Sequence, residues 1–235
     1  MQETIKLLVN GCGFSRGPSS WPYQLKGVDV TNLACSGAGN NYIHDTTVSE
    51  LSKRKYDFVA VMWSKITRVD IKVNAIEQFR NSTNTSEYQS SKNDWPEKKI
   101  FPINDQDFVE KDWVFGQGFL NKNKDPVIVD SNIFNGIYNN KADHQFVYDL
   151  LIKMISLQAI LKQLNIPYLF MFYQNYEHEL FEYMNFYDML DKTHIYNAEN
   201  IYDIAIQKES FELDRYTPGA TAQTTWAELI QPLIT

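Results

Sequence analysis

The chain has 235 residues, of which 43% are hydrophobic and 14% aromatic, and it carries a formal net charge of −7 at pH 7. This composition excludes a disordered chain, and the length allows one substantial hydrophobic core without requiring a second. A nucleic-acid backbone binder needs a basic stripe, so the acidic balance leads us to expect no nucleic-acid partner.

The first residues, MQETIKLLVNGC, lack the basic segment, long apolar run and small-residue cleavage site of a signal peptide. We therefore expect no secretion by a signal peptide and a cytoplasmic location. No apolar run approaches the roughly 20 residues that a membrane helix needs, so we expect no membrane partner. Cys12 and Cys35 are too few for a disulfide framework, and we expect both to be thiols that pack as small hydrophobic side chains.

The first quarter of the chain alternates between strand and helix patterns. Ile5 to Cys12 is an apolar run that predicts a buried parallel strand, and Val28 to Leu33 predicts a second one. The small residues of CSGAGNN follow, where a backbone can approach a ligand closely. A helix is expected from Asn40 to Lys55, capped by one of its two leading asparagines. Asp57 to Trp63, DFVAVMW, is the clearest buried strand.

The middle of the chain, at about 80–140, is polar with scattered aromatic residues and has no regular period. Long segments of this kind in a compact domain are usually lids, binding loops or interface elements. We expect an insertion whose rings either cover a small core of its own or line a ligand cleft or partner surface. Those rings belong to Trp95, Phe101, Phe108, Trp113, Phe115 and Phe119.

The last part of the chain resumes the alternation. Apolar residues at helical spacing predict a helix from Ala142 to Gln163, and Tyr168 to Tyr173 predicts the next strand. Tyr173 to Asp191 indicates an amphipathic helix on the sheet, although its Tyr and Glu residues also suit a carbohydrate site. The final helix is expected from Ala220 to Leu233.

Buried strands that alternate with helices predict an α/β fold with a mostly parallel sheet covered on both faces. Ligands of such sheets bind at the carboxyl ends of the strands. The loops after Val9, Leu33 and Met62 should therefore share one edge of the sheet.

Four ordered blocks of residues are spread over nearly the whole chain. The blocks are Gly11-Cys12-Gly13-Phe14-Ser15-Arg16-Gly17 with Trp21-Pro22-Tyr23-Gln24-Leu25, Asn32-Leu33-Ala34-Cys35-Ser36-Gly37, Val61-Met62-Trp63-Ser64 with Arg68, and Asp214-Arg215-Tyr216-Thr217-Pro218-Gly219 with Trp226-Ala227-Glu228-Leu229. They resemble the G-C-S-F-T-x-G…W-P-x-Q-L, N-x-G-x-S-G, W-S…R and D-x-x-H-P patterns of the SGNH/GDSL hydrolases, in the phage-type variant of that family. This resemblance implies a three-layer α/β/α, flavodoxin-like single domain over residues 1–235, with the insertion at about 80–140.

The resemblance also implies roles for individual residues. In the family a Ser attacks an ester, a His takes its proton, an Asp orients the His, and backbone N–H groups hold the oxyanion. Here Asp214 is the retained acid, and Gly37 stands where an oxyanion donor stands. Gly13 occupies the nucleophile position and Thr217 the base position, while Ser64 lies near the position of an Asn donor. Since Thr217 cannot act as a base near neutral pH, an ordinary Ser-His-Asp esterase is not expected.

Three functions follow as hypotheses. The first is a hydrolase-like protein that has lost this activity and binds an acylated carbohydrate, with no cofactor. The second is a structural protein with a protein partner or an oligomeric form, virion-associated if the chain is phage-encoded. The third is an active esterase with a relocated nucleophile at Ser15, Ser36 or a cysteine, although we expect Ser15 to hydrogen-bond within its own loop. The expected ligand-binding residues are Gly13, Ser15, Ser36, Gly37, Ser64 and Thr217.

The four histidines are scattered along the sequence, and none forms a pair with metal-ligand spacing. We therefore expect no metal site, and each imidazole is expected on a surface or a helix face. They are His44, His144, His178 and His194.

Overall fold

The computed structural model describes residues 4–72, 113–116, 143–176, 183–211 and 218–234. Its centre is a five-stranded sheet in the order β2-β1-β3-β6-β7, in which every pairing is parallel. This is the flavodoxin-like strand order, so the predicted fold class is confirmed. The strands are β1 (Ile5–Asn10), β2 (Val28–Asn32), β3 (Phe58–Trp63), β6 (Tyr168–Phe172) and β7 (Ile195–Tyr196).

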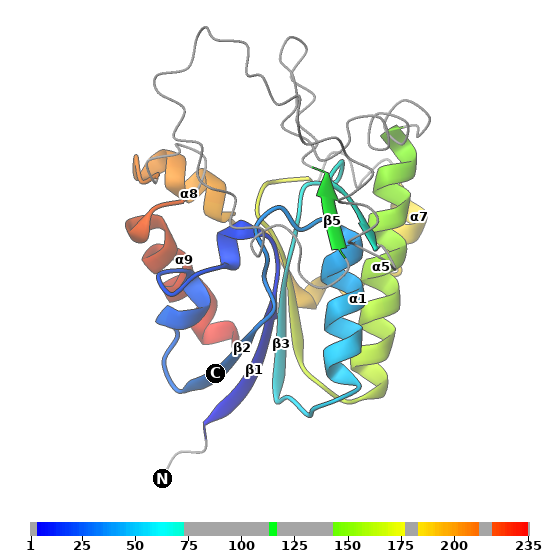
Figure 1. Cartoon of the computed structure of the whole chain (residues 1–235), viewed down its shortest axis with the longest axis horizontal. Helices are drawn as coiled ribbons and strands as arrows, with labels where there is room; N and C mark the ends of the chain where they lie inside the picture. Colours follow the sequence, from blue (N-terminus) through cyan, green and yellow to red (C-terminus); the bar gives the residue numbers. More distant parts are fainter. Residues whose placement is uncertain (1–3, 73–112, 117–142, 177–182, 212–217, 235) are drawn as a thin grey trace, which may run out of the picture.

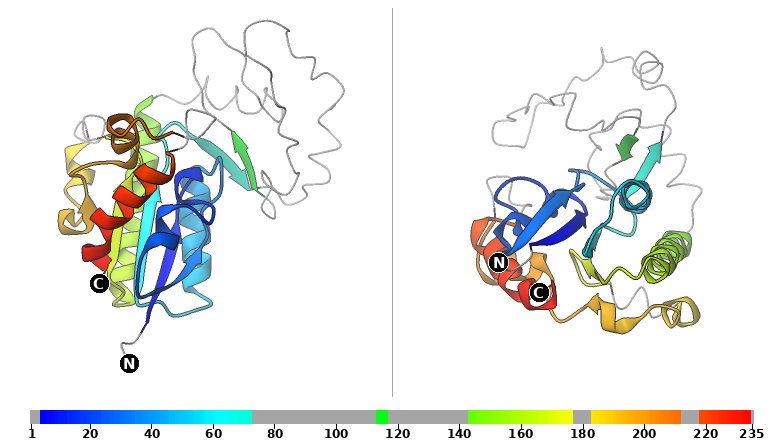
Figure 2. Two further views of the ribbon diagram at one scale, coloured as in Figure 1. Left: turned by 90° about the vertical axis from the view of Figure 1, so that its left-hand side faces the viewer. Right: turned by 90° about the horizontal axis from the view of Figure 1, so that it is seen from below.

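Helices cover both faces of this sheet and make three layers (Figures 1 and 2). One face packs against α1 (Asn40–Leu51), α5 (Asp143–Gln163) and α7 (Met184–Tyr187). The other face packs against α8 (Ile201–Gln207), α9 (Ala220–Ile234) and the short 3-10 helix η2 (Trp21–Gln24). Two further 3-10 turns, η1 (Gly13–Ser15) and η4 (Lys192–His194), lie in the connections.

The alternation of side chains along β3 explains the two cores. Its six residues are all buried, because successive side chains point to opposite faces and both faces are covered. Val61 and Trp63 belong to the cluster under α1 and α5, whereas Ala60 and Met62 belong to the cluster under α8 and α9. The sequence DFVAVMW is therefore apolar at every position from Phe58 onward.

The start of α1 differs from the prediction. Its N-cap is Gly39, which has no side-chain capping bond, so the expectation of an asparagine cap is wrong. The carboxylate of Asp70 supplies the missing acceptor, with Oδ1 3.2 Å from the backbone nitrogen of Asn41 and Oδ2 2.7 Å from that of Tyr42. The helix ends at Leu51, earlier than the predicted Lys55.

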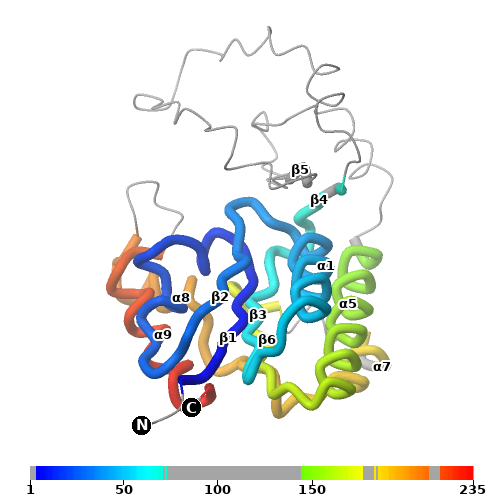
Figure 3. The backbone as a smooth tube through the Cα atoms, turned by 60° about the horizontal axis from the view of Figure 1, so that its bottom comes forward, coloured from blue at the N-terminus to red at the C-terminus, as the bar shows by residue number. Residues whose placement is uncertain are grey.

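Asp70 belongs to a second, smaller sheet. In it β4 (Val69–Lys72) pairs antiparallel with β5 (Trp113–Gly116), and β4 packs beside α1 (Figure 3). Strand β5 is the part of the expected insertion that the structure describes. The other aromatic residues named for the insertion lie outside the described residues, and its role stays a prediction.

The segment after β6 also differs in part. Within the expected helix Tyr173 to Asp191, the described helix is the single turn α7, and residues 177–182 are outside the description. Tyr176, Tyr187 and Leu190 are buried in the core cluster, so this segment does pack on the sheet layer. Strand β7 and helix α8 were not predicted from the sequence.

Candidate functional site

The candidate site lies where four neighbouring strands end. The strand order reverses between β1 and β3, and a parallel sheet binds ligands at the carboxyl ends beside such a reversal. We use "the rim" for residues 11–15, 34–39, 64–68 and 173–176, which follow β1, β2, β3 and β6. The backbone N–H groups of Leu33 and Cys35 donate to the carbonyls of Val9 and Gly11, at 2.8 and 3.1 Å. The prediction that these loops share one edge is confirmed.

Gly13 and Ser36 meet at this edge. A Cβ atom built on Gly13 would lie 3.4 Å from Oγ of Ser36 and 3.6 Å from its Cα. Both residues are half-buried. The position at which the family resemblance expects a nucleophile thus holds no side chain, and among the described residues the nearest hydroxyl is that of Ser36.

Ser15 lies deeper than either of them. It has no exposed surface, and its Oγ accepts a hydrogen bond from Trp21 Nε1 at 3.1 Å and lies 3.5 Å from Met62 Sδ. Its carbonyl accepts from Asn32 Nδ2 at 2.7 Å. The expectation that Ser15 hydrogen-bonds around its own loop is confirmed, and its hydroxyl does not reach the surface of the rim.

The loop after β2 needs glycine. Gly37 is buried with φ at +84°, in the left-handed region that side chains rarely adopt. Gly39 has no room for a side chain, since a Cβ atom there would lie 2.9 Å from the Arg68 carbonyl oxygen and from Asp70 Cγ. The loops after β2 and β3 therefore pack backbone against backbone.

The side chains of Asn40 and Arg68 bind Ser64 to these two loops. Ser64 is fully buried, and its N–H donates to Asn40 Oδ1 at 2.9 Å. Arg68 Nη1 donates to Ser64 Oγ at 3.0 Å and to the carbonyl of Ala38 at 3.2 Å. The sequence did not predict that the Asn40 side chain binds the backbone of Ser64, because the two residues are 24 positions apart.

Aromatic side chains complete the rim above β6. The rings of Phe14 and Tyr173 meet edge to face with centroids 5.0 Å apart, and Tyr173 contacts Tyr176 in the same way at 6.0 Å. Burial raises the pKa of both phenols, and the nearby charge of Arg68 opposes that rise only in part. Both hydroxyls therefore stay protonated at neutral pH and can donate hydrogen bonds.

Asp70 is the buried carboxyl closest in sequence to the rim. Burial raises its pKa from 3.8 to about 6, although backbone N–H groups of Tyr42, Asn41 and Gly39 and the charge of Lys153 favour the ionised form. Asp70, Arg68 and Lys153 line a cavity of about 230 Å³ between α1, β4 and α5.

The remaining expected residues fall into three groups. Cys12 and Cys35 are buried free thiols, as predicted. His44 lies near Asp45 and Ser156, His194 stacks on Tyr168, and His144 is exposed in the first turn of α5. Asp214, Thr217 and His178 lie outside the described residues.

Two features are absent from the described ranges. No group of three or more His, Cys, Asp and Glu side chains there is arranged to hold a metal ion. Among the helices in the described part of the chain, none has the length and apolar character needed to cross a bilayer.

No protein-family model matches the sequence, and no curated protein is detectably similar to it. Similar solved structures include the psychrotrophic esterase EstA from Pseudoalteromonas sp., at 13% identity over 98% of this chain and 92% of that one, with a TM-score of 0.47. A putative lipolytic protein of the G-D-S-L family from Desulfitobacterium hafniense has 9% identity over 97% and 99%, with a TM-score of 0.48. A catalytic mutant of the acetylxylan esterase Axe2 from Geobacillus stearothermophilus has 10% identity over 100% and 95%, with a TM-score of 0.47. Likeness of this degree says nothing about the activity of this chain.

Proposed function

We propose that this chain is a hydrolase-like binding protein that takes an acylated carbohydrate at the rim and does not hydrolyse it through a Ser-His-Asp triad. The observation that supports the proposal is the contact between Gly13 and Ser36, since the nucleophile position has no functional group. A site at the carboxyl ends of the strands that keeps its ligand-binding loops but lacks a nucleophile can bind an ester without hydrolysing it.

The groups that remain at the rim suit a sugar ester. Phe14 and Tyr173 present half-buried rings, and such rings stack on the apolar faces of sugars. The phenols of Tyr173 and Tyr176 and the guanidinium of Arg68 are hydrogen-bond donors, which complement the hydroxyl and acyl oxygens of the ligand. A protein partner, an oligomeric form and a virion-associated location stay predictions from the sequence.

The first experiment combines binding with ester cleavage. Titration with acetylated and deacetylated oligosaccharides should give saturable binding to the acetylated form, with no release of acetate. The double variant Gly13→Ser, Thr217→His should gain hydrolysis of short aryl esters, while Gly13→Ala, Thr217→His serves as its control. Absence of saturable binding to every oligosaccharide of the panel would overturn the proposal.

A second candidate function is an esterase with Ser36 as the relocated nucleophile. Its support is that Ser36 Oγ lies 3.4 Å from the position of a residue-13 Cβ atom, within the space in which the family's nucleophile would act. If the unaltered protein hydrolyses aryl esters and Ser36→Ala abolishes this activity, the second candidate replaces the first. Ser19→Ala is the control, because Ser19 is exposed outside the rim.

A further inference from the structure

Ser156, His44 and Asp45 form a connected set of side chains in the layer of helices α1 and α5. Asp45 Oδ1 lies 2.9 Å from Nδ1 of His44, and Ser156 Oγ lies 3.4 Å from Nε2 of the same ring. His44 and Asp45 belong to α1, and Ser156 belongs to α5, which lies beside α1 (Figures 1 and 3). A serine beside a base that a third group orients is the arrangement that activates a nucleophile.

The carboxylate of Asp45 determines which nitrogen of His44 can act as a base. A carboxylate only accepts hydrogen bonds, so in the neutral ring Nδ1 carries the hydrogen and donates it to Oδ1. Nε2 then has the free lone pair, and this atom faces the hydroxyl of Ser156. The distance of 3.4 Å is longer than an ideal hydrogen bond, as is common for catalytic groups before a substrate binds.

The hydroxyl of Ser156 has no competing acceptor among the described residues. Hydroxyl groups inside helices often bond to the carbonyl four residues earlier. Thr46 and Thr47 of α1 do so, both at 2.6 Å. Within the described ranges the contact of Ser156 Oγ is instead with the His44 ring. The hydroxyl proton is therefore available to Nε2.

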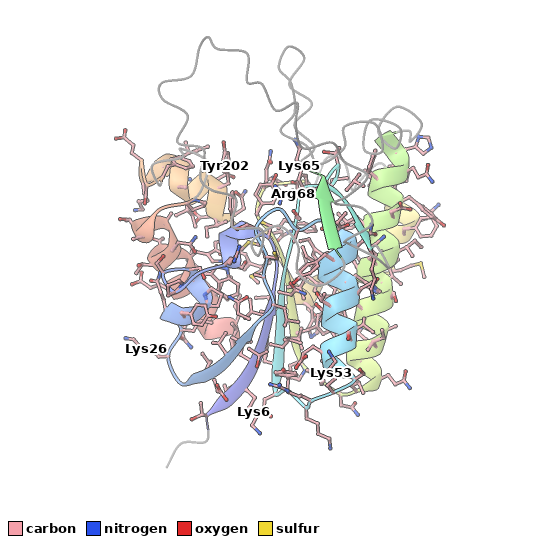
Figure 4. All side chains as sticks on the ribbon, viewed as in Figure 1. Lys6, Lys26, Lys53, Lys65, Arg68 and Tyr202 are labelled. Atoms are coloured by element: carbon pink, nitrogen blue, oxygen red, sulfur yellow. The ribbon has the colours of Figure 1, made fainter. Side chains whose placement is uncertain are left out.

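The set is accessible to solvent and separate from the rim. The side chain of His44 is 18% exposed and that of Asp45 is 52% exposed, while Ser156 is half-buried. None of the three residues belongs to the rim or lines the cavity between α1, β4 and α5. In Figure 4, Arg68 marks the end of the sheet that carries the rim and Lys53 marks the opposite end, so the α1 and α5 layer runs between them.

Apolar side chains flank the set on both helices. Residues four apart lie on the same helix face, which places Val48 next to His44, and Ile152 and Ile160 next to Ser156. Ile152 is 41% exposed, and Val48 and Ile160 are half-buried. This surface suits a small apolar acyl or aryl group.

The backbone around Ser156 limits the esters that can react. An oxyanion hole is usually built from free backbone N–H groups. Ser156 lies inside a helix of 21 residues, whose interior N–H groups donate to carbonyls of the helix itself. Water must therefore stabilise the oxyanion, and only an ester with a good leaving group reacts.

We propose that Ser156 is an activated nucleophile that takes an acyl group from aryl esters, with His44 as its base and Asp45 as the positioning residue. Ser156 Oγ forms a bond to the acyl carbon and the bond from that carbon to the aryl oxygen breaks. His44 Nε2 takes the hydroxyl proton and passes it to the leaving oxygen. Water, deprotonated by the same Nε2 atom, then hydrolyses the acyl-serine. A sugar acetate has a poorer leaving group, so this site is independent of ligand binding at the rim.

The test measures acylation at individual serines. The full chain is incubated with p-nitrophenyl acetate, quenched with acid at early times and mapped by peptide mass spectrometry, while absorbance follows the released p-nitrophenolate. Base catalysis should acylate Ser156 about 100-fold faster than Ser49, an exposed serine of α1. Ser156→Ala should abolish the fast release of p-nitrophenolate and leave oligosaccharide binding at the rim unchanged. If Ser156 carries no adduct and Ser156→Ala releases p-nitrophenolate at the unaltered rate, the proposal is overturned.

Variants of the two α1 residues separate activation from simple exposure. His44→Gln keeps a polar side chain but no base, so acylation of Ser156 should slow about 100-fold while the melting temperature holds. Asp45→Asn offers an amide that can donate to Nδ1, which moves the hydrogen to Nε2 and should slow acylation as well. Asp45→Glu should restore part of the rate. Full acylation of Ser156 in His44→Gln would overturn the proposal, and equal rates for the two Asp45 variants would overturn the role of Asp45.

Discussion

Gly13 lies directly against Ser36, so that a Cβ atom on Gly13 would stand 3.4 Å from Ser36 Oγ and 3.8 Å from its Cβ. These distances are at the ordinary van der Waals limit, and the φ angle of Gly13 is outside the left-handed region. The rim therefore has space for a small side chain at the position where the family resemblance expects the nucleophile.

The first prediction is that Gly13→Ser folds as well as the unaltered chain. Because the new Cβ atom meets no atom closer than contact distance, the free energy of unfolding should change by less than about 1 kcal/mol. Urea unfolding followed by circular dichroism measures it. A loss several times larger would mean that the loops after β1 and β2 are packed more tightly than these distances indicate.

The second prediction is that Gly39→Ala destabilises the chain. The new Cβ atom would lie 2.9 Å from the Arg68 carbonyl oxygen and from Asp70 Cγ, and backbone cannot move away as easily as a side-chain tip. Overpacking of this kind costs about 1–3 kcal/mol. Gly13→Ala is the matched control and should be near neutral in the same urea titration. Equal stability of the two alanine variants would contradict the close approach of β4 to the start of α1.

Long-range contacts explain which features the sequence could predict and which it could not. Strand β3 was predictable because a segment buried on both sides must be apolar throughout, as DFVAVMW is. The cap of α1 was not, because Asp70 binds the N–H of Tyr42 from 28 residues away. The residues next to Gly39 in the sequence give no sign that a distant carboxylate caps the helix.

The candidate site was predictable in its place but not in its polar contacts. The ends of the predicted strands determine where the rim lies. The four sequence blocks predicted that Gly13, Ser36 and Ser64 lie there. Tyr176 sits in a stretch whose aromatic pattern favours core packing and only secondarily suits ligand binding. The bond from Arg68 to the Ala38 carbonyl joins two loops 30 residues apart, and no local pattern carries it. Strand β7 and helix α8 were missed because two and seven residues are too short for a periodic signal.

The third prediction concerns pH. The pKa of Asp70 is 3.8 in the unfolded chain and about 6 in the folded one, so the folded state binds more protons between these values. The free energy of unfolding contributed by Asp70 therefore falls as the pH rises from about 4 to about 6, and is constant above that range. At 1.36 kcal/mol for each pKa unit, the fall is roughly 3 kcal/mol.

Asp70→Asn isolates this contribution. The variant loses an acceptor at the start of α1, so its absolute stability changes as well, and the readout is the difference between the two pH profiles. Urea unfolding at half-unit steps from pH 4 to pH 7 should show the unaltered chain losing stability relative to the variant. Asp29→Asn, at an exposed position on β2, should run parallel to the unaltered chain. Parallel profiles for Asp70→Asn would refute the raised pKa.

The fourth prediction concerns Gln223, through which α9 holds the loop after β1. Its Oε1 accepts the N–H of Trp21 at 2.9 Å, and its Nε2 donates to the Phe14 carbonyl at 3.1 Å, in a site where Gln223 is 4% exposed. Gln223→Ala leaves both backbone groups unpaired, which should lower the free energy of unfolding by about 1–3 kcal/mol.

Gln231 provides the matched control for this variant. It lies on the same helix and bonds in the same way, with Oε1 2.7 Å from the Lys26 nitrogen and Nε2 3.2 Å from the Lys26 carbonyl oxygen, but the contact is exposed. Because water replaces exposed bonds, Gln231→Ala should change the free energy of unfolding by about 0.5 kcal/mol or less. Gln223 also holds the loop in which Phe14 contacts the ring of Tyr173. Gln223→Ala should therefore weaken oligosaccharide binding, while Gln231→Ala should leave it intact. If both variants lose equal stability, burial does not determine how much the Gln223 hydrogen bonds contribute to the free energy of unfolding.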